Sequence, residues 1–397
     1  MSVTYPRGFR AAGVTAGFKP SGLPDLGLLL GEPGTTAAGL FTTNRVAAAP
    51  VWLSRERLRS GSPRGVLVNS GQANAATGAR GLRDAEHATA AAADLLGMDA
   101  TEVLPGSTGV IGEPLHMDDL VAALPKLRAA LDPEGGDDFA RAIMTTDTVD
   151  KQANADAGRA RVGGCAKGVG MISPNLATML VFVTTDAAVA ASDLQRLAEQ
   201  ELKPRFNALT VDACTSTNDT VLLLASGAAG EPPRAPSSPS WSELSDAVGS
   251  VGESLLRQLA ADAEGGQHVL LVDVTGASSE GEARLVAKAV ADSPLVKTAA
   301  FGGDPNPGRI LQAVGASGAA VDPNRIDIDL GDVRLVEGGV IFPAYFGSDP
   351  LHDTAQAQVR GHEISVHICI GDGPGCSRSL GCDLSYEYVR INGEYTT

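Results

Sequence analysis

Short apolar runs alternate with helical segments along this chain, and that alternation restricts it to mixed folds of sheets and helices. The apolar runs are rich in Val, Leu and Ile and are bounded by turn-forming residues, as buried strands are. We expect strands over residues 65–71, 180–185, 221–225, 269–276, 325–336 and 363–371. Abundant Ala and Gly let such elements pack closely, so the sequence predicts a layered α/β body.

The helical segments are expected at residues 84–98, 117–131, 192–202 and about 241–263. Pro125 lies inside the second of these, where proline kinks or splits a helix. Residues 231–240 form the one clear Pro/Ser-rich interruption. Because strand and helix patterns continue on both sides of it, we predict a surface loop there rather than a linker between domains.

Acidic residues outnumber basic ones by 47 to 31, which gives a formal net charge of −16. Nucleic acids and anionic membrane surfaces attract cationic proteins, so neither is an expected partner. The sequence has no apolar run long enough to span a bilayer and no secretory signal pattern at its start. Small molecules are therefore the expected partners.

The metal-ligating residue types lack the spacings of metal sites. None of the five cysteines forms a CxxC pair, which indicates reduced thiols and a cytoplasmic location. The six histidines show no HExxH or other paired pattern, so no metal site is predicted. Phosphate-binding glycine motifs are also missing, so no cofactor is expected.

The densest cluster of chemically suggestive residues lies between residues 142 and 186. Lys167 stands in GCAKGVGM, where glycines permit a close approach of the backbone. Thr178 stands between a turn-like SPN segment and a strand. A lysine flanked by glycine and a threonine at a strand entrance are also common structural features, so neither identifies a site by itself.

Ordered blocks over nearly the whole chain resemble the ornithine acetyltransferases, also called glutamate N-acetyltransferases. The resemblance begins with GFRAAGVTAG near the start. The other blocks are NSGQANAATG (69–78), STGVIG (107–112), AIMTTDT (142–148), KGVGMISPNLATMLVFVTTD (167–186), TSTNDTVLLLASG (215–227), ADAEG (261–265), SPLVKTAAFGGDPN (293–306) and GCDLSYEYVRINGEYTT (381–397). The resemblance implies a stacked-sheet sandwich with outer helices, the fold shared with related aminopeptidases, plus a smaller α/β domain.

The same resemblance implies that the precursor cuts itself between Ala177 and Thr178. The products would be an α chain of residues 1–177 and a β chain of residues 178–397, interlocked in one larger and one smaller domain. Thr178 would then be an N-terminal nucleophile whose own α-amine serves as the general base. An α-amine has a pKa of roughly 7.7–8.0, so it supplies a base near neutral pH only after the cut.

Further site residues are carried over from the family's pattern. Thr108 and Gly109 would form the oxyanion hole, where losing one donor costs roughly 2.7–4 kcal/mol of barrier. The substrate-binding set implied by the resemblance is Thr145, Lys167, Thr178, Glu264, Asn392 and Thr397. An ammonium such as Lys167 suits an α-carboxylate, and a carboxylate such as Glu264 suits a cationic amine.

Some positions depart from the family's pattern. Pro307 stands where the family has tryptophan, which removes an aromatic face and a backbone donor. Gln267 and His268 follow a glycine after ADAEG, where threonine and lysine are usual, and Gly393 follows Asn392 in place of serine. These departures indicate either altered substrate preference or neutral drift.

The leading hypothesis is therefore a ping-pong acetyltransferase of arginine biosynthesis. N-acetylornithine would acylate Thr178, and glutamate would take the acetyl group; some family members also accept acetyl-CoA. The family implies an α2β2 heterotetramer. Three alternatives stay open: a specialised-metabolism acyltransferase with another amino-acid acceptor, an N-terminal-nucleophile aminopeptidase, and a binding protein without catalysis.

Overall fold

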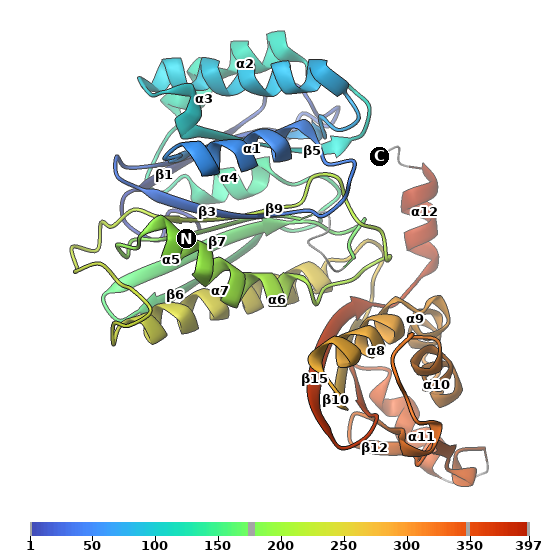
Figure 1. Ribbon diagram of the computed structural model, residues 1–397. Coiled ribbons are helices and arrows are strands. Elements are labelled where there is room, and N and C mark those ends of the chain that lie inside the picture. Colours follow the sequence, from blue (N-terminus) through green and yellow to red (C-terminus); the bar gives the residue numbers. More distant parts are fainter. Residues whose placement is uncertain (1, 174–178, 347–349, 395–397) are drawn as a thin grey trace. The chain divides into compact units, whose positions relative to one another are not determined.

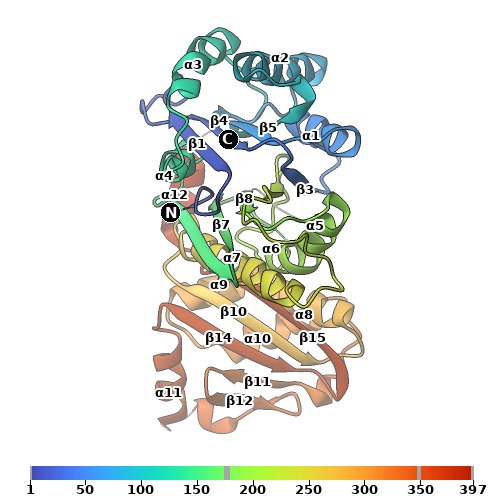
Figure 2. The same ribbon diagram turned by 90° about the vertical axis from the view of Figure 1, so that its left-hand side faces the viewer.

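The computed structural model describes residues 2–173, 179–346 and 350–394, and it divides into two compact units (Figures 1 and 2). The first unit holds the chain up to Asn207 together with Cys214–Leu259. The second holds Ala208–Ala213 and the chain from Ala260 through the last described helix. No helix in the described part of the chain is long and apolar enough to cross a membrane.

Two sheets form the body of the first unit. The first sheet has the order β1-β2-β4-β5 and consists of β1 (Phe9–Val14), β2 (Leu26–Gly31), β4 (Gly65–Gln72) and β5 (Val103–Val110). The second has the order β3-β9-β8-β7-β6 and consists of β3 (Thr36–Phe41), β9 (Thr220–Ala225), β8 (Leu180–Thr185), β7 (Ala160–Lys167) and β6 (Lys151–Ala157). In these sheets only the pairs β4–β5 and β8–β9 are parallel.

The two sheets stack on a shared apolar core, with helices on their outer faces (Figure 1). Phe139 of α4 (Gly136–Ala142) meets Phe182 of β8 edge to face, with ring centroids 5.2 Å apart. The first sheet is covered outside by α2 (Gly78–Leu96) and α3 (Met117–Ala129). The remaining helices are α1 (Ala49–Ser60), α5 (Ala191–Leu197), α6 (Lys203–Phe206) and α7 (Trp241–Ala261). The expected α/β sandwich is therefore confirmed.

Most of the expected elements of this unit form where the sequence predicts them. All residues of β8 and β9 are buried, which explains their continuous apolar sequences, because both faces of these strands are covered. The helix predicted at 117–131 does not split, since α3 continues through Pro125. The helix predicted at 192–202 becomes α5, a π-helical turn at Ala198–Leu202, and α6.

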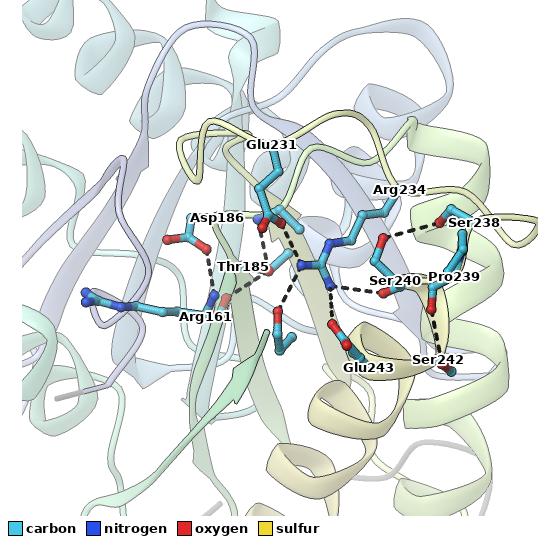
Figure 3. A network of polar contacts seen from close by, with 12 residues as sticks. Arg161, Thr185, Asp186, Glu231, Arg234, Ser238, Pro239, Ser240, Ser242 and Glu243 are labelled. Carbon is cyan, nitrogen blue, oxygen red and sulfur yellow. Dashed lines mark hydrogen bonds and ion pairs between the residues drawn. The ribbon is translucent and has the colours of Figure 1, made fainter. Parts of the chain in front are cut away.

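The predicted surface loop at residues 231–240 is confirmed, but Arg234 within it is buried (Figure 3). Its guanidinium donates hydrogen bonds to the Ala157 carbonyl at 2.9 Å, the Ser240 carbonyl at 3.0 Å and the Glu231 carboxylate at 2.6 Å. Glu243 of α7 lies 3.9 Å from the same guanidinium. One arginine thus fastens the loop to the end of β6 and to the start of α7.

The second unit contains a six-stranded sheet, and most of its helices pack on that sheet. Its order is β13-β12-β11-β14-β10-β15, with β10 (Val269–Gly276), β11 (Asp327–Leu330), β12 (Val333–Glu337), β13 (Val340–Ile341), β14 (Glu363–Cys369) and β15 (Gly373–Cys382). The helices are α8 (Glu280–Asp292), α9 (Pro294–Phe301), α10 (Pro307–Gly315), α11 (Pro350–Gln358) and α12 (Tyr386–Glu394). Buried and more exposed residues alternate along β11 and β14, as in a sheet packed on one face.

The single strand predicted at residues 325–336 is wrong. The chain instead turns at Gly331 and forms the antiparallel pair β11–β12. Gly331 has a φ of +55°, which glycine adopts readily and which a continuous strand does not allow. A glycine followed by an aspartate is a common hairpin turn, so the sequence did contain the signal.

Candidate active site

Lys167 is the last residue of β7, and the residue is 2% exposed. Its ammonium donates a hydrogen bond to the Thr145 hydroxyl at 2.6 Å and lies 3.4 Å from the Thr108 hydroxyl. Thr145 follows α4, whereas Thr108 lies near the end of β5 in the other sheet. The structure therefore brings together three of the residues that the sequence analysis assigned to the site.

Asp147 organises this cluster, and the sequence analysis gave it no role. Its carboxylate accepts hydrogen bonds from the Lys151 ammonium at 2.7 Å, the Gly168 N–H at 2.8 Å and the Thr145 N–H at 3.0 Å. The Lys167 ammonium lies 3.6 Å from the same carboxylate. Asp147 lies within the AIMTTDT block, so its position was available in the sequence, but its contacts arise from the folding of separate segments.

Electrostatics keeps Asp147 ionised despite its burial. Burial alone would raise the pKa of its carboxyl, but the ammonium groups of Lys167 and Lys151 outweigh that effect and hold the pKa well below its ordinary value. One carboxylate and two ammonium groups leave this triad with one positive charge. A site with that charge suits a substrate carboxylate.

Gly109 follows Thr108 at the end of β5 and must be glycine. Its φ is +129°, and a Cβ atom there would lie 2.2 Å from the Gly71 carbonyl oxygen. Gly71 is its register partner in the parallel pair β4–β5. Two neighbouring strands thus approach each other closely at their carboxyl ends, and this approach fixes the backbone of the predicted oxyanion-hole residues.

The TSTND block supports this edge from the second sheet. The Asn218 amide donates hydrogen bonds to the Ser107 carbonyl at 2.8 Å and to the Ala73 carbonyl at 2.6 Å, next to Thr108. Asp219 accepts a hydrogen bond of 3.1 Å from the Met179 N–H. Burial raises the pKa of Asp219 well above its ordinary value. Asn218 and Asp219 are therefore candidate positioning residues that the sequence analysis quoted without a role.

A loop near the start of the chain carries another lysine, Lys19, whose charge interacts with that of Lys167. The Asp25 carboxylate accepts hydrogen bonds from the backbone N–H groups of residues 16–19, at 2.6 to 3.1 Å. Lys19 at the end of this loop donates to the Pro24 carbonyl at 2.6 Å. Burial lowers the pKa of the Lys19 ammonium to about 8; Asp25 opposes that effect, and the charge of Lys167 adds to it.

The remaining predicted residues fall into two groups. Glu264 and Asn392 belong to the second unit, where the Asn392 amide donates to the Glu264 carboxylate at 3.0 Å. The structure brings the half-buried Glu264 and the exposed Asn392 together within that unit. Ala177, Thr178 and Thr397 lie outside the described residues. The predicted nucleophile and cleavage point therefore have no described geometry.

The departures from the family's pattern all lie in the second unit. Pro307 is the first residue of α10, a position where a helix needs no backbone N–H, and the Asn306 side chain caps this helix by accepting from the Arg309 N–H. Gln267 and His268 both donate their backbone N–H groups to Asp383. Gly393 lies on exposed α12. A proline at the first position of α10 therefore fits the local structure.

Among the described residues, no group of three or more His, Cys, Asp or Glu side chains is placed to hold a metal ion. The cysteines, all of which lie in the described part of the chain, are free thiols.

The first unit is an α/β sandwich of two stacked sheets with outer helices. At the edge where β5 and β7 end, Lys167, Thr145 and Thr108 form a buried polar cluster that resembles an active site. The chain belongs to the ArgJ family, whose model matches residues 10–397. It is 43% identical to "Arginine biosynthesis bifunctional protein ArgJ 1" of Nostoc sp., covering 100% of this chain and 98% of the relative. It is 46% identical to the ArgJ protein of Parasynechococcus marenigrum, covering 100% and 95%.

A solved structure agrees with this assignment. The crystal structure of the arginine biosynthesis bifunctional protein ArgJ from Bacillus halodurans matches with a TM-score of 0.51 and 38% identity. The match covers 54% of this chain and 98% of the Bacillus chain. The predicted family membership is confirmed.

Proposed function

We propose that this chain is an acetyltransferase of arginine biosynthesis that carries the acetyl group on Thr178. Relatives that match it over its full length are named as bifunctional proteins of arginine biosynthesis. In the proposed reaction, N-acetylornithine donates the acetyl group and glutamate accepts it. Acetyl-CoA would be a second donor, which would give the chain amino-acid N-acetyltransferase activity as well.

The contact of Lys167 with Thr145 and Thr108 is the observation that carries this proposal. Ammonium and hydroxyl groups from both sheets meet where β5 and β7 end. Met179, the neighbour of Thr178 in the sequence, is held by Asp219 at the start of β8, which pairs with β7. Such an edge provides a positive charge for a substrate carboxylate and polar groups for a reacting carbonyl.

Self-cleavage would come first. The Thr178 hydroxyl attacks the Ala177 carbonyl carbon, the peptide C–N bond breaks as the chain shifts to the oxygen, and water hydrolyses the ester. Thr108 and Gly109 are proposed to stabilise the oxyanion. The freed α-amine of Thr178 is then the base for transfer.

Transfer follows in two half-reactions. The Thr178 oxygen attacks the acetyl carbonyl, and the C–N bond to ornithine breaks as its amine takes the proton. The glutamate amine then attacks the acetyl ester, the C–O bond breaks, and the proton returns to the threonine oxygen. Each half-reaction passes through one oxyanion.

The length of the solved Bacillus chain supports the cut. Nearly all of that chain is matched by 54% of this one. The predicted β chain is 220 of 397 residues, or about 55%. One solved chain of the family is thus about as long as the predicted fragment.

Substrate contacts are proposed for the other carried-over residues. Lys167 would bind an α-carboxylate with Thr145 beside it, and Glu264 would bind the cationic amine of ornithine. Asn392 and Thr397 are proposed as further substrate-binding residues. The proposal also includes a cytoplasmic α2β2 heterotetramer, and the free thiols suit a reducing compartment.

Intact-mass analysis of the purified protein beside Thr178→Ala tests the nucleophile. Scaling 40.5 kDa by 177 and 220 of 397 residues predicts fragments of about 18 and 22 kDa. The wild type should show both fragments, with the larger beginning at Thr178, and Thr178→Ala should stay uncut. Thr101→Ala, at an exposed threonine, should be cut like the wild type. A folded wild type of full length would overturn the mechanism.

Incubation with N-acetylornithine alone tests the transfer step. One acetyl group should appear on the larger fragment and leave as N-acetylglutamate when glutamate is added. Release of free acetate without any acceptor would instead identify a hydrolase.

A further inference from the structure

We propose that a cavity at the opposite end of the first unit's sheets binds a small anion through carboxylate or phosphate oxygens. The cavity has a volume of about 350 Å³, within the range of pockets that hold small molecules. Four arginines line it, and Glu32 is the single acidic residue of its lining. The arginines are Arg7, Arg10, Arg64 and Arg161.

The fold gathers these arginines from separate segments. Arg7 and Arg10 lie just before and within β1, Arg64 directly precedes β4, and Arg161 is the second residue of β7. Strands of both sheets therefore contribute arginines to the one cavity. The chain as a whole has a net charge of −16, so this concentration of positive charge is local.

Two of the four guanidinium groups are held in place by the protein. Arg64 pairs with Glu102 at 2.9 Å and donates to the Gly31 carbonyl at 3.2 Å. The Arg161 guanidinium lies over the Tyr5 ring, 5.1 Å from its centroid. Figure 3 shows the Arg161 side chain extending away from the hydrogen bonds around Arg234. The guanidinium groups of Arg64 and Arg161 are therefore held in position before an anion binds.

The other two guanidinium groups have binding capacity left. Arg7 is about half exposed, and its Nε lies 4.0 Å from Asp186, beyond hydrogen-bond distance. Within the described ranges, the exposed Arg10 side chain has no hydrogen bond and no ion pair. Guanidinium groups bind carboxylates and phosphates with two parallel hydrogen bonds, so this pair supplies the recognition chemistry.

The cavity is separate from the candidate active site. Arg161 and Lys167 lie near opposite ends of β7, six residues apart. At roughly 3.3 Å per residue, that separation is about 20 Å. An anion bound beside Arg161 therefore does not occupy the site around Lys167.

Calorimetric titration of the full, purified protein tests the proposal with two probes, pyrophosphate and citrate. The wild type should bind at least one of them, and Arg10→Gln should weaken that binding roughly tenfold, the loss of one charge-assisted contact. Arg7→Gln should weaken it in the same direction. Arg83→Gln removes the same charge from an exposed position of α2 and should bind like the wild type.

The two probes distinguish the source of the oxyanion. Tighter binding of pyrophosphate assigns the cavity to phosphate-bearing molecules, and tighter binding of citrate assigns it to carboxylates. Equal affinities of the wild type and Arg10→Gln, or no binding of either probe at millimolar concentration, would overturn the proposal.

Discussion

Lys167 and Glu264 are both charged residues assigned to substrate binding, yet they lie in opposite surroundings. Lys167 is buried in the first unit and shares Asp147 with Lys151. Glu264 lies on the second unit and has the exposed Asn392 as its partner. A buried ion cluster resists rearrangement because each charge depends on the others, whereas the half-buried Glu264 carboxylate keeps part of its water. The comparison contrasts a rigid environment in the first unit with a more adaptable one in the second.

The largest expected effect comes from removing the charge at the centre of the buried cluster. Asp147→Asn leaves two buried ammonium groups without their carboxylate, so the free energy of unfolding should fall by about 3–5 kcal/mol. Urea unfolding measures this change. Asp94→Asn, at an exposed position of α2, should leave stability nearly unchanged. Equal stabilities of the two variants would show that the charge of Asp147 does not stabilise the folded protein.

Titration of Lys19 should give a smaller effect that depends on pH. Its pKa is about 8 in the folded protein and about 10.4 in an unfolded chain, so the unfolded state binds more protons between these values. The stability of the wild type relative to Lys19→Met should therefore rise as the pH increases from 8 to 10. Unfolding curves across this range measure the difference. A flat difference would mean that Lys19 is solvated like a surface lysine.

The smallest expected effect belongs to the exposed pair. Glu264→Gln should change the free energy of unfolding by less than about 1 kcal/mol, because an exposed polar contact contributes little. If Glu264 binds the ornithine amine, the same variant should raise KM for N-acetylornithine while thermal unfolding stays near that of the wild type. A large loss of stability would place Glu264 in the structural framework and remove the contrast with Lys167.

The sequence predicted the elements better than the contacts between them. The apolar runs at β8 and β9 could be recognised because burial on both faces leaves a continuous hydrophobic pattern. The hairpin at Gly331 was missed because polar and apolar residues alternate on both sides of the Gly331–Asp332 turn, so the two short strands look like one longer strand. Local patterns of this kind carry the fold class but not every turn.

The same holds for the candidate site, where residues could be predicted but their contacts could not. Family blocks identified Lys167, Thr145 and Thr108, which the structure brings together. Asp147 received no role, because its importance comes from Lys151 and Lys167 meeting around it after folding. Arg234 was expected in a surface loop and is instead buried, since Ala157 of β6 and Glu243 of α7 are among its partners. Long-range partners of charged residues have no periodic signature in a sequence.

The order of strands in the second sheet has a consequence for how this protein can be made. The central strands β8 and β9 follow the proposed cleavage point, and β3 and β7 on either side of them precede it (Figure 1). Translated from two separate messages, the halves would each emerge with open strand edges that invite aggregation. A single translation product avoids this danger, because the sheet closes before the backbone is broken. Under this proposal, only chains that have already folded would be cut.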